Sequence, residues 1–519
     1  MPRHGNKPGK GIGGLLQIVF SRTMLITVLL ILNFLYLFSV IFDLFKFVPV
    51  LFGSMVVFTA LVELWILNSS DDVDVKLTWA VVVAVLPLLG AAMYAFVRFD
   101  LGNRVNKRMN RNSILASLPF VPDNTGMAER MEAEAPDLLP IARYLSAHAN
   151  APAFSDTEIS YYPLGENMFE ALLPELEKAE KYIYMEYFLV SEGHMWNSIL
   201  EILKRKAAEG IDVRFLYDGM NAFTNLPYRY PEELKKLGIK CKMHAPVRPF
   251  VSTHYNYRDH RKITVIDGHT AFTGGINLED RYINIGSPYG HWKDTAIMLK
   301  GDAARGFTLL FLQMWNSTER VQDFTPCLEK PAHPFRSSGF VIPYGYSPMD
   351  DENVGEQVYL HMINRANKYI HIMTPYLIPD EELIDALCFA AKRGVDVRLI
   401  LPGICDHKII QIIARSYYRK LVECGVGIYE YTPGFVHAKV FLSDDLHAVV
   451  GTINLDYRSL RHHFECAAYL YGLPAIAGIG EDFRLTQEQC QQMDPERIGQ
   501  FSRFSRIIAY LVKFAAPLL

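Results

Sequence analysis

The chain has 519 residues, half of them hydrophobic, and a formal net charge of −4. This length allows more than one domain with a sizeable core, and the lack of a basic excess counts against a nucleic-acid-binding protein. The seven cysteines form no Cys-x-x-Cys pair and show no His/Cys ligand spacing. The sequence therefore predicts neither a disulfide framework nor a zinc site.

Three apolar runs lie near the N-terminus, at residues 24–42, 48–67 and 77–97. Each has about 20 residues, and as a helix rising about 1.5 Å per residue each would cross the roughly 30 Å apolar core of a bilayer. We therefore expect residues 1–102 to form a membrane region of transmembrane helices.

The basic residues around these runs leave the membrane topology open. One cluster precedes the first run, and a second, from Arg98 to Arg111, follows the third run. Both clusters favour the cytoplasmic side of the membrane. Three full spans would instead put the two clusters on opposite sides. Either one run is re-entrant or interfacial, or the N-terminus lies outside. We favour a cytoplasmic soluble part after two true spans, with the role of the first run left open.

The soluble part is predicted to consist of two related halves. Residues 103–154 are polar and contain prolines, which indicates a linker. Strand-like runs at 182–190 and 210–218 flank a helical stretch, and runs at 369–378 and 394–402 repeat this order. This alternation indicates βαβ units and mainly parallel sheets with helices outside. We expect two α/β domains, at 155–335 and 336–490, packed with pseudo-twofold symmetry around a shared site.

The last segment, residues 491–519, carries large apolar side chains at helical spacing with Arg and Lys between them. We expect an amphipathic helix here, lying either on a membrane surface or against the core of the protein. The apolar positions are Phe501, Phe504, Ile507, Ile508, Leu511 and Phe514.

One short pattern, His-x-Lys-x4-Asp, occurs twice in the soluble part. The first copy contains His260 and Lys262, and the second contains His437 and Lys439. Each pair lies in a strand-like run, where residues i and i+2 point to the same face. The copies are 177 residues apart. Two matched sets on one chain predict two half-sites that face each other across a shared phosphate.

An Asn follows each motif His after 17 residues, at Asn277 and Asn454. Both follow glycine-containing turns, where the backbone comes close to a ligand. We expect these two amides, with Lys262 and Lys439, to bind the non-bridging phosphate oxygens and to stabilise the charge of the transition state. With two Lys present, no metal and no cofactor are expected.

The residue types fit phosphodiester transfer. One His attacks phosphorus to form a phosphohistidine, which divides a difficult substitution into two steps. The other His protonates the departing alkoxide and then deprotonates the incoming hydroxyl, a task that suits the near-neutral pKa of imidazole.

Four carboxylates are candidates for the same site. Asp267 and Asp444 are counted with the catalytic set as members of the motif, although their position on the opposite strand face favours a structural role. Asp294 and Glu465 are the better candidates for orienting the two His rings, because a carboxylate on one ring nitrogen fixes the tautomer and supports the imidazolium.

The paired motifs and their flanks resemble bacterial cardiolipin synthases of the phospholipase D superfamily. The resemblance rests on the segments 258–268, 272–278, 374–380 and 454–459, and on Trp79, Pro87–Gly90 and Tyr94 in the membrane region. It implies transfer between two phosphatidylglycerol molecules at the plasma membrane, giving cardiolipin and glycerol through a phosphatidyl-histidine. It also implies that His260 is the nucleophile and His437 the acid and base. One departure is His463, where the family commonly has Asn.

Three alternatives remain open at this stage. A hydrolase with the same chemistry would use water as the acceptor, and a membrane-tethered nuclease would use a different phosphodiester, although the charge balance counts against it. A lipid-binding scaffold without catalysis would not need two complete His-Lys-Asn sets.

Overall fold

The computed structural model describes residues 28, 30, 31, 33, 34, 38, 49–99, 103–122, 126–221, 225–227, 229–246, 257–328, 335, 337–350, 352–502, 508, 509, 512 and 513. Two compact units divide the chain. The first comprises Met1–Val105, Arg248–Tyr255 and Phe514–Leu519, and the second comprises Asn106–Val247 and Asn256–Lys513. Both motif copies lie in the second unit.

The helices α3 (Pro49–Leu67), α4 (Val73–Val85) and α5 (Pro87–Phe99) belong to the first unit. The third apolar run was expected as one span, but the helix breaks at Leu86, which has φ −127 and ψ 71. Pro87 causes the break, because it lacks an N–H group and disfavours helical geometry at the residue before it. The run therefore forms two 13-residue helices, each about 20 Å long.

These two helices form a hairpin. Gly90 of α5 lies so close to α4 that a Cβ atom there would be 2.9 Å from the carbonyl oxygen of Val82. At the open end, Arg98 Nη1 donates to Asp71 Oδ1 at 3.1 Å. The start of α4 and the end of α5 therefore lie at the same end of the hairpin.

Within the described residues, no helix combines the length and the apolar character needed to cross a membrane. The expected span at 24–42 lies mostly outside the described residues. The transmembrane helices predicted from the sequence are thus not confirmed.

The segment predicted as a linker contains helices. They are α6 (Arg104–Ser117), η2 (Leu118–Phe120), α7 (Met127–Glu134) and α8 (Leu139–Ala149). Polar side chains attach α6 to the second unit: Asn110 Nδ2 donates to Ser347 Oγ at 3.2 Å, and Ser113 Oγ donates to the Gln313 carbonyl at 2.7 Å. The polar residues that suggested a linker form these buried hydrogen bonds instead.

The first half of the second unit contains a seven-stranded sheet in the order β1-β9-β7-β6-β2-β3-β4. Its elements are β1 (Thr157–Tyr162), α9 (Gly165–Glu177), β2 (Tyr182–Tyr187), α10 (His194–Ala208), β3 (Asp212–Asp218), α12 (Tyr230–Lys236), β4 (Lys240–His244), β5 (Arg258–Asp259), β6 (Lys262–Ile266), β7 (Thr270–Gly274), η4 (Asp280–Ile283), β8 (His291–Lys293), β9 (Ala296–Gly301), α13 (Ala304–Asn316) and η5 (Thr325–Leu328). The strands expected at 182–190 and 210–218 are β2 and β3.

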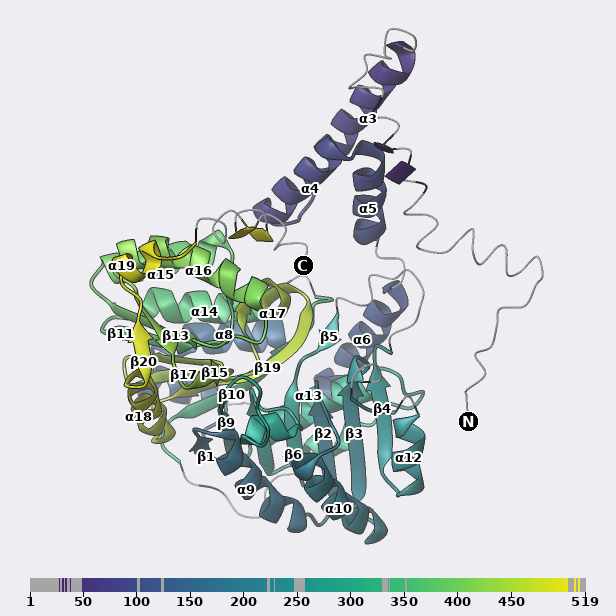
Figure 1. The fold of residues 1–519 in the computed structure, drawn as a ribbon. Coiled ribbons are helices and arrows are strands. Elements are labelled where there is room, and N and C mark those ends of the chain that lie inside the picture. The colour runs from purple at the N-terminus through teal and green to yellow at the C-terminus, as the bar shows by residue number, and fades with distance from the viewer. Residues whose placement is uncertain are drawn as a thin grey trace, which may run out of the picture. The chain divides into compact units, whose positions relative to one another are not determined.

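The second half repeats this plan in a sheet with the main order β10-β19-β17-β16-β11-β13-β14-β20. Its elements are β10 (Phe340–Tyr346), α14 (Val354–Arg365), β11 (Tyr369–Met373), β12 (Leu377–Ile378), α15 (Glu381–Lys392), β13 (Asp396–Pro402), α16 (Lys408–Glu423), β14 (Gly427–Tyr431), β15 (Gly434–Val436), β16 (Val440–Ser443), β17 (His447–Gly451), β18 (Leu455–Asp456), α17 (Tyr457–Arg461), β19 (His463–Tyr471), α18 (Ala475–Gln487), β20 (Cys490–Gln492) and α19 (Pro495–Gly499). Figure 1 shows α14, α15 and α16 around this sheet and α9 and α10 beside β2 and β3.

The α/β class is confirmed, but the expectation of mainly parallel sheets is wrong. The strands joined through helices are parallel, as in β2-β3-β4 and β11-β13-β14, whereas the other neighbours along the two sheet orders are antiparallel. The cause is a short turn after each motif strand. Asp267, Gly268, Asp444 and Asp445 all have positive φ, and a connection this short joins only antiparallel strands.

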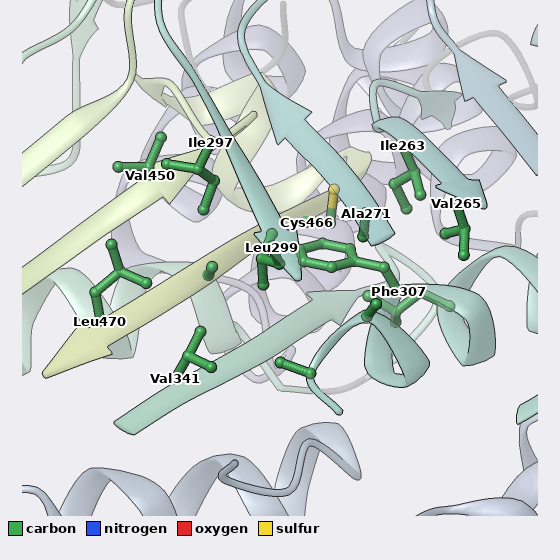
Figure 2. Packing of buried hydrophobic residues seen from close by; sticks show 14 of the residues in the cluster. Ile263, Val265, Ala271, Ile297, Leu299, Phe307, Val341, Val450, Cys466 and Leu470 are labelled. Atoms are coloured by element: carbon green, nitrogen blue, oxygen red, sulfur yellow. The ribbon is translucent and has the colours of Figure 1, made fainter. Parts of the chain in front are cut away.

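One hydrophobic cluster joins the two sheets. In Figure 2, Ile297 of β9 lies beside Val450 of β17, and Leu299 of β9 lies beside the Phe307 ring of α13; Leu470 of β19 belongs to the same cluster. Burial of apolar side chains from both halves in one cluster holds the halves together.

Of the C-terminal helix predicted at 491–519, the structure describes residues 491–502, 508, 509, 512 and 513. Residues 491–502 contain the end of β20 and the short helix α19. Further along, Lys513 Nζ lies 3.1 Å from Glu381 Oε1 and 4.1 Å from the centroid of the Tyr417 ring. These contacts favour the alternative in which this segment docks on the core.

Candidate active site

Each motif His is positioned by the backbone of the opposite half. Strand β5, which precedes His260, pairs with β19, and strand β15, which precedes His437, pairs with β8. The two histidines also form backbone hydrogen bonds with the opposite half. His260 N donates to the Phe464 carbonyl at 3.0 Å, and His437 N donates to the Lys293 carbonyl at 2.7 Å. Both His side chains are 8% exposed.

The two carboxylates predicted to orient the His rings contact the Nδ1 atoms of these rings. Each carboxylate belongs to the half opposite its histidine. Glu465 Oε1 and Oε2 are 2.9 and 3.0 Å from His260 Nδ1, and Asp294 Oδ2 is 2.6 Å from His437 Nδ1. When Nδ1 donates to a carboxylate, the lone pair is on Nε2. Each ring is therefore held in the tautomer in which Nε2 serves as nucleophile or base.

The two carboxylates have different surroundings. The hydroxyl of Thr452 donates to Glu465, and His463 Nδ1 lies 3.6 Å from Glu465 Oε1. Asp294 accepts the backbone N–H of Thr295 at 2.8 Å. Gly275 occupies the place of Thr452 in the first motif copy, and a Cβ atom there would lie 2.0 Å from Asp294 Oδ1. Only a glycine leaves room for the first-half carboxylate.

The two lysines fold back onto their own motif. Lys262 Nζ donates to the His260 carbonyl at 2.5 Å, and Lys439 Nζ makes the same contact with the His437 carbonyl. His and Lys thus lie together, as the i, i+2 spacing predicts, although the strands are interrupted at the motif. An ammonium group has three donors, so each Lys retains hydrogens for a phosphate.

His437 Nδ1 has a second neighbour, Lys439 Nζ at 2.9 Å. A ring nitrogen that donates to Asp294 does not also accept from an ammonium group. The Asp294 contact is shorter, at 2.6 Å, and it is the charge-assisted one when Nδ1 carries the proton. We therefore assign the Nδ1 hydrogen to Asp294.

The two motif asparagines differ in their contacts. Asn277 Oδ1 accepts from Leu189 N at 3.0 Å, and its Nδ2 donates to the Tyr282 hydroxyl at 2.7 Å. Asn454 is buried, and its Oδ1 has no hydrogen-bond partner among the described residues. Asn277 is therefore fixed in place with one amide hydrogen to spare.

Asp267 and Asp444, counted with the catalytic set from the motif, do not join the site. The carboxylate of Asp267 accepts backbone N–H groups from residues 180–182, each at 2.8 Å. That of Asp444 accepts those of residues 367–369 at 2.8 to 2.9 Å. Both carboxylates therefore close the turn onto the neighbouring strand, and the catalytic assignment of these two residues is corrected to a structural one.

Burial sets the charge of the site. It lowers the pKa of His260 to about 3, against the opposing charge of Glu465, and together with Lys439 it holds the pKa of His437 well below its usual range. Burial alone would raise the pKa of Glu465, but its contact with the His260 ring outweighs burial and lowers the pKa. Both imidazoles are therefore neutral at neutral pH, with Glu465 ionised.

The remaining charged groups are also shifted by burial. The pKa falls to about 8 for Lys262 and to about 7 for Lys439, in spite of nearby carboxylates. Burial raises the pKa of Asp294 to about 6, against the charge of Lys439. A phosphate anion in this site would favour the charged form of both lysines.

Several site neighbours had no signal in the sequence analysis. The Tyr282 and Trp292 rings lie 5.4 Å from the His437 ring, and the Phe188 ring lies 5.1 Å from the His260 ring. Together with Thr452, they surround the polar groups with apolar surface, but no motif marks them. His463, noted only as a departure from a pattern, lies 5.4 Å from His260 by ring centroids.

Comparison with known proteins agrees with this site. Residues 172–315 and 359–485 match the family described as "Cardiolipin synthase, PLD-like domain". A cardiolipin synthase of Geobacillus kaustophilus is 34% identical over 473 residues, covering 91% of this chain and 93% of that protein. An uncharacterized protein of Streptococcus mutans is 45% identical over 456 residues, covering 88% and 99%.

The fold has a counterpart among solved structures. Phosphatidylserine synthase of Haemophilus influenzae matches with a TM-score of 0.55 at 14% identity, covering 73% of this chain and 98% of that one. At this identity the likeness shows the fold alone. With the matched family covering both halves, and a relative above 30% identity along most of the chain, this protein belongs to the cardiolipin synthase family with phospholipase D-like domains.

Proposed function

We propose that this protein is a phosphatidyltransferase that makes cardiolipin and glycerol from two phosphatidylglycerol molecules through a phosphatidyl-histidine. One observation carries the proposal: each motif His donates through Nδ1 to a carboxylate of the opposite half, in a chain that belongs to the cardiolipin synthase family. The paired rings supply a nucleophile and an acid-base group in one buried site.

In the first step, His260 Nε2 attacks the phosphorus of one phosphatidylglycerol. The P–O bond to the head-group glycerol breaks, and His437 gives its proton to the departing oxygen. Positive charge develops on the His260 ring, where Glu465 stabilises it. Lys262 and Lys439 stabilise the non-bridging oxygens, with Asn277 and Asn454 as further donors.

In the second step, neutral His437 removes the proton from a head-group hydroxyl of the second phosphatidylglycerol. That oxygen attacks phosphorus, the P–N bond to His260 breaks, and cardiolipin forms. His437 is protonated again and the cycle closes. In the first step His437 needs a proton, which the phosphodiester anion favours, because a nearby negative charge raises the pKa of imidazole.

The different carboxylates support His260 as the nucleophile. Glu465 has a lowered pKa and stays ionised, which suits a ring that becomes a charged phospho-imidazolium. The pKa of Asp294 is raised by burial to about 6. Asp294 is therefore the more basic of the two carboxylates, and a basic partner on Nδ1 strengthens His437 as the base that takes a hydroxyl proton at Nε2.

We also propose that the N-terminal unit anchors the protein in the bacterial plasma membrane. The described helices carry exposed large apolar side chains, among them Val57, Leu61, Leu64, Leu77 and Val85, as a lipid-facing surface requires. The hairpin of α4 and α5 suits a re-entrant element. An even number of membrane crossings in this unit places both basic clusters and the catalytic unit on the cytoplasmic side.

The test is a product analysis with head-group-labelled phosphatidylglycerol and membranes that contain the protein, with His260→Ala as the control. Cardiolipin and an equal amount of free glycerol are the expected products, and both should be lost in the control. Phosphatidic acid and glycerol without cardiolipin would mean that water is the acceptor. Unchanged phosphatidylglycerol would refute the proposal.

A further inference from the structure

His463 is the feature of the site that the proposed reaction does not use. Its side chain is 11% exposed, and its Nδ1 is buried without a hydrogen-bond partner among the described residues. The nearest carboxylate oxygen, Glu465 Oε1, lies 3.6 Å away, beyond hydrogen-bond distance. A buried ring nitrogen in this state costs free energy unless something binds it.

The ligand atoms of three residues converge at this point. One atom each from His260, His463 and Glu465 lies within 4.8 Å of the others. Glu465 Oε1 is 2.9 Å from His260 Nδ1 and 3.6 Å from His463 Nδ1. In a tetrahedral site, ligand atoms about 2.0–2.1 Å from zinc lie roughly 3.3 Å from one another. The two distances from Glu465 Oε1 to the imidazole nitrogens are slightly shorter and slightly longer than this ligand-to-ligand distance.

We propose that His260, His463 and Glu465 form a zinc-binding site, and that zinc bound there inhibits the enzyme. Two imidazoles and a carboxylate are ligands that zinc accepts, with a water molecule in the fourth position. Imidazole nitrogen also disfavours magnesium and calcium, which take oxygen ligands. The positive charge of Lys262 opposes the ion, so binding should be reversible rather than structural.

Inhibition follows from the tautomer of His260, and this part rests on the proposed function. Zinc occupies the Nδ1 lone pair, so the ring proton moves from Nδ1 to Nε2 without change in the charge of the ring. The Nε2 lone pair that attacks phosphorus is then lost. Zinc also takes the Glu465 oxygen that would stabilise the phospho-imidazolium.

The experiment uses the full-length protein in detergent micelles, freed of metal with a chelator and titrated with Co²⁺, whose absorption reports tetrahedral ligands. We expect one Co²⁺ per chain, displaced by Zn²⁺. In His463→Asn, affinity should fall at least about 10-fold, since even the loss of an outer partner costs that much. His463→Gln is a second variant in case the first does not fold, and His462→Asn, at the adjacent histidine, is the matched control.

Transferase rates with and without Zn²⁺ are then compared within each variant. Zn²⁺ should inhibit the native enzyme and His462→Asn over the range in which it binds, and His463→Asn should resist it. Equal Co²⁺ affinity in the native protein and in both His463 variants would overturn the site. Binding without inhibition of an active enzyme would overturn the inhibitory role. Binding by a protein with no transferase activity would support the metal site and refute the proposed function instead.

Discussion

Replacing Glu465 with Gln removes one charge from the site and keeps the size of the side chain. The carboxylate is fully buried and contacts His260 Nδ1 at 2.9 and 3.0 Å. A hydrogen bond to a charged group contributes about 1.5–3 kcal/mol, and about 1.4 kcal/mol corresponds to a factor of ten in rate. Loss of the charge alone should therefore slow the transfer by about 10- to 100-fold.

The amide adds a second effect. Its NH₂ group donates to Nδ1, which places the ring proton on Nε2, the nitrogen that attacks. The equivalent exchange in a serine protease triad lowers kcat by about 10⁴. For Glu465→Gln we therefore expect a fall in kcat of between about 10² and 10⁴, with a small change in KM.

The assay is the release of labelled glycerol from phosphatidylglycerol in mixed micelles, normalised to folded protein. Glu430→Gln is the matched control, because Glu430 is buried and paired with Arg415 at 2.8 Å outside the site. It should cost stability and leave kcat within a few-fold. A Glu465→Gln enzyme within tenfold of the native kcat would refute the role given to this carboxylate.

Three further predictions follow from the same geometry. Asp267→Ala removes the acceptor of three backbone N–H groups, so it should lower the free energy of unfolding by about 2–4 kcal/mol while the rate per folded molecule changes little; a thermal melt beside a rate assay checks both. Gly275→Ala places a Cβ atom 2.0 Å from Asp294 Oδ1, so it should displace that carboxylate and lower kcat by about 10²-fold, and a rate near the native one would contradict this. Burial lowers the pKa of Lys262 to about 8 and that of Lys439 to about 7, so the free enzyme loses phosphate-binding charge as pH rises through these values. The kcat/KM should therefore fall from about pH 7 and more steeply above about pH 8, and a flat alkaline limb would count against the two lysines as phosphate ligands.

The sequence was sufficient for the α/β class and for the two His-Lys pairs, but not for the aromatic neighbours of the site. The His-x-Lys spacing placed Lys262 and Lys439 beside their histidines, and that relation is local to one strand. Asp294 and Glu465 were also identified, as carboxylates able to fix the tautomer of the His rings. Their pairing with His437 and His260 was not predicted, because contacts between segments more than a hundred residues apart depend on how the halves pack.

Each error has its own physical cause. The alternation of strands and helices predicted parallel sheets, but the turns at Asp267 and Asp444 reverse the motif strands into hairpins. The polar linker and the apolar third run were each interpreted from composition. The buried hydrogen bond from Asn110 to Ser347 and the helix break before Pro87 decided the actual structure there.

The most direct test of the account is to identify the covalent intermediate. Enzyme in turnover with phosphatidylglycerol is stopped with denaturant at mildly alkaline pH, where a phosphohistidine survives, and its peptides are analysed by mass spectrometry. The account predicts a phosphatidyl group on His260, absent from His260→Ala. A native enzyme that forms cardiolipin with the phosphatidyl group on His437, or with none on either histidine, would contradict it.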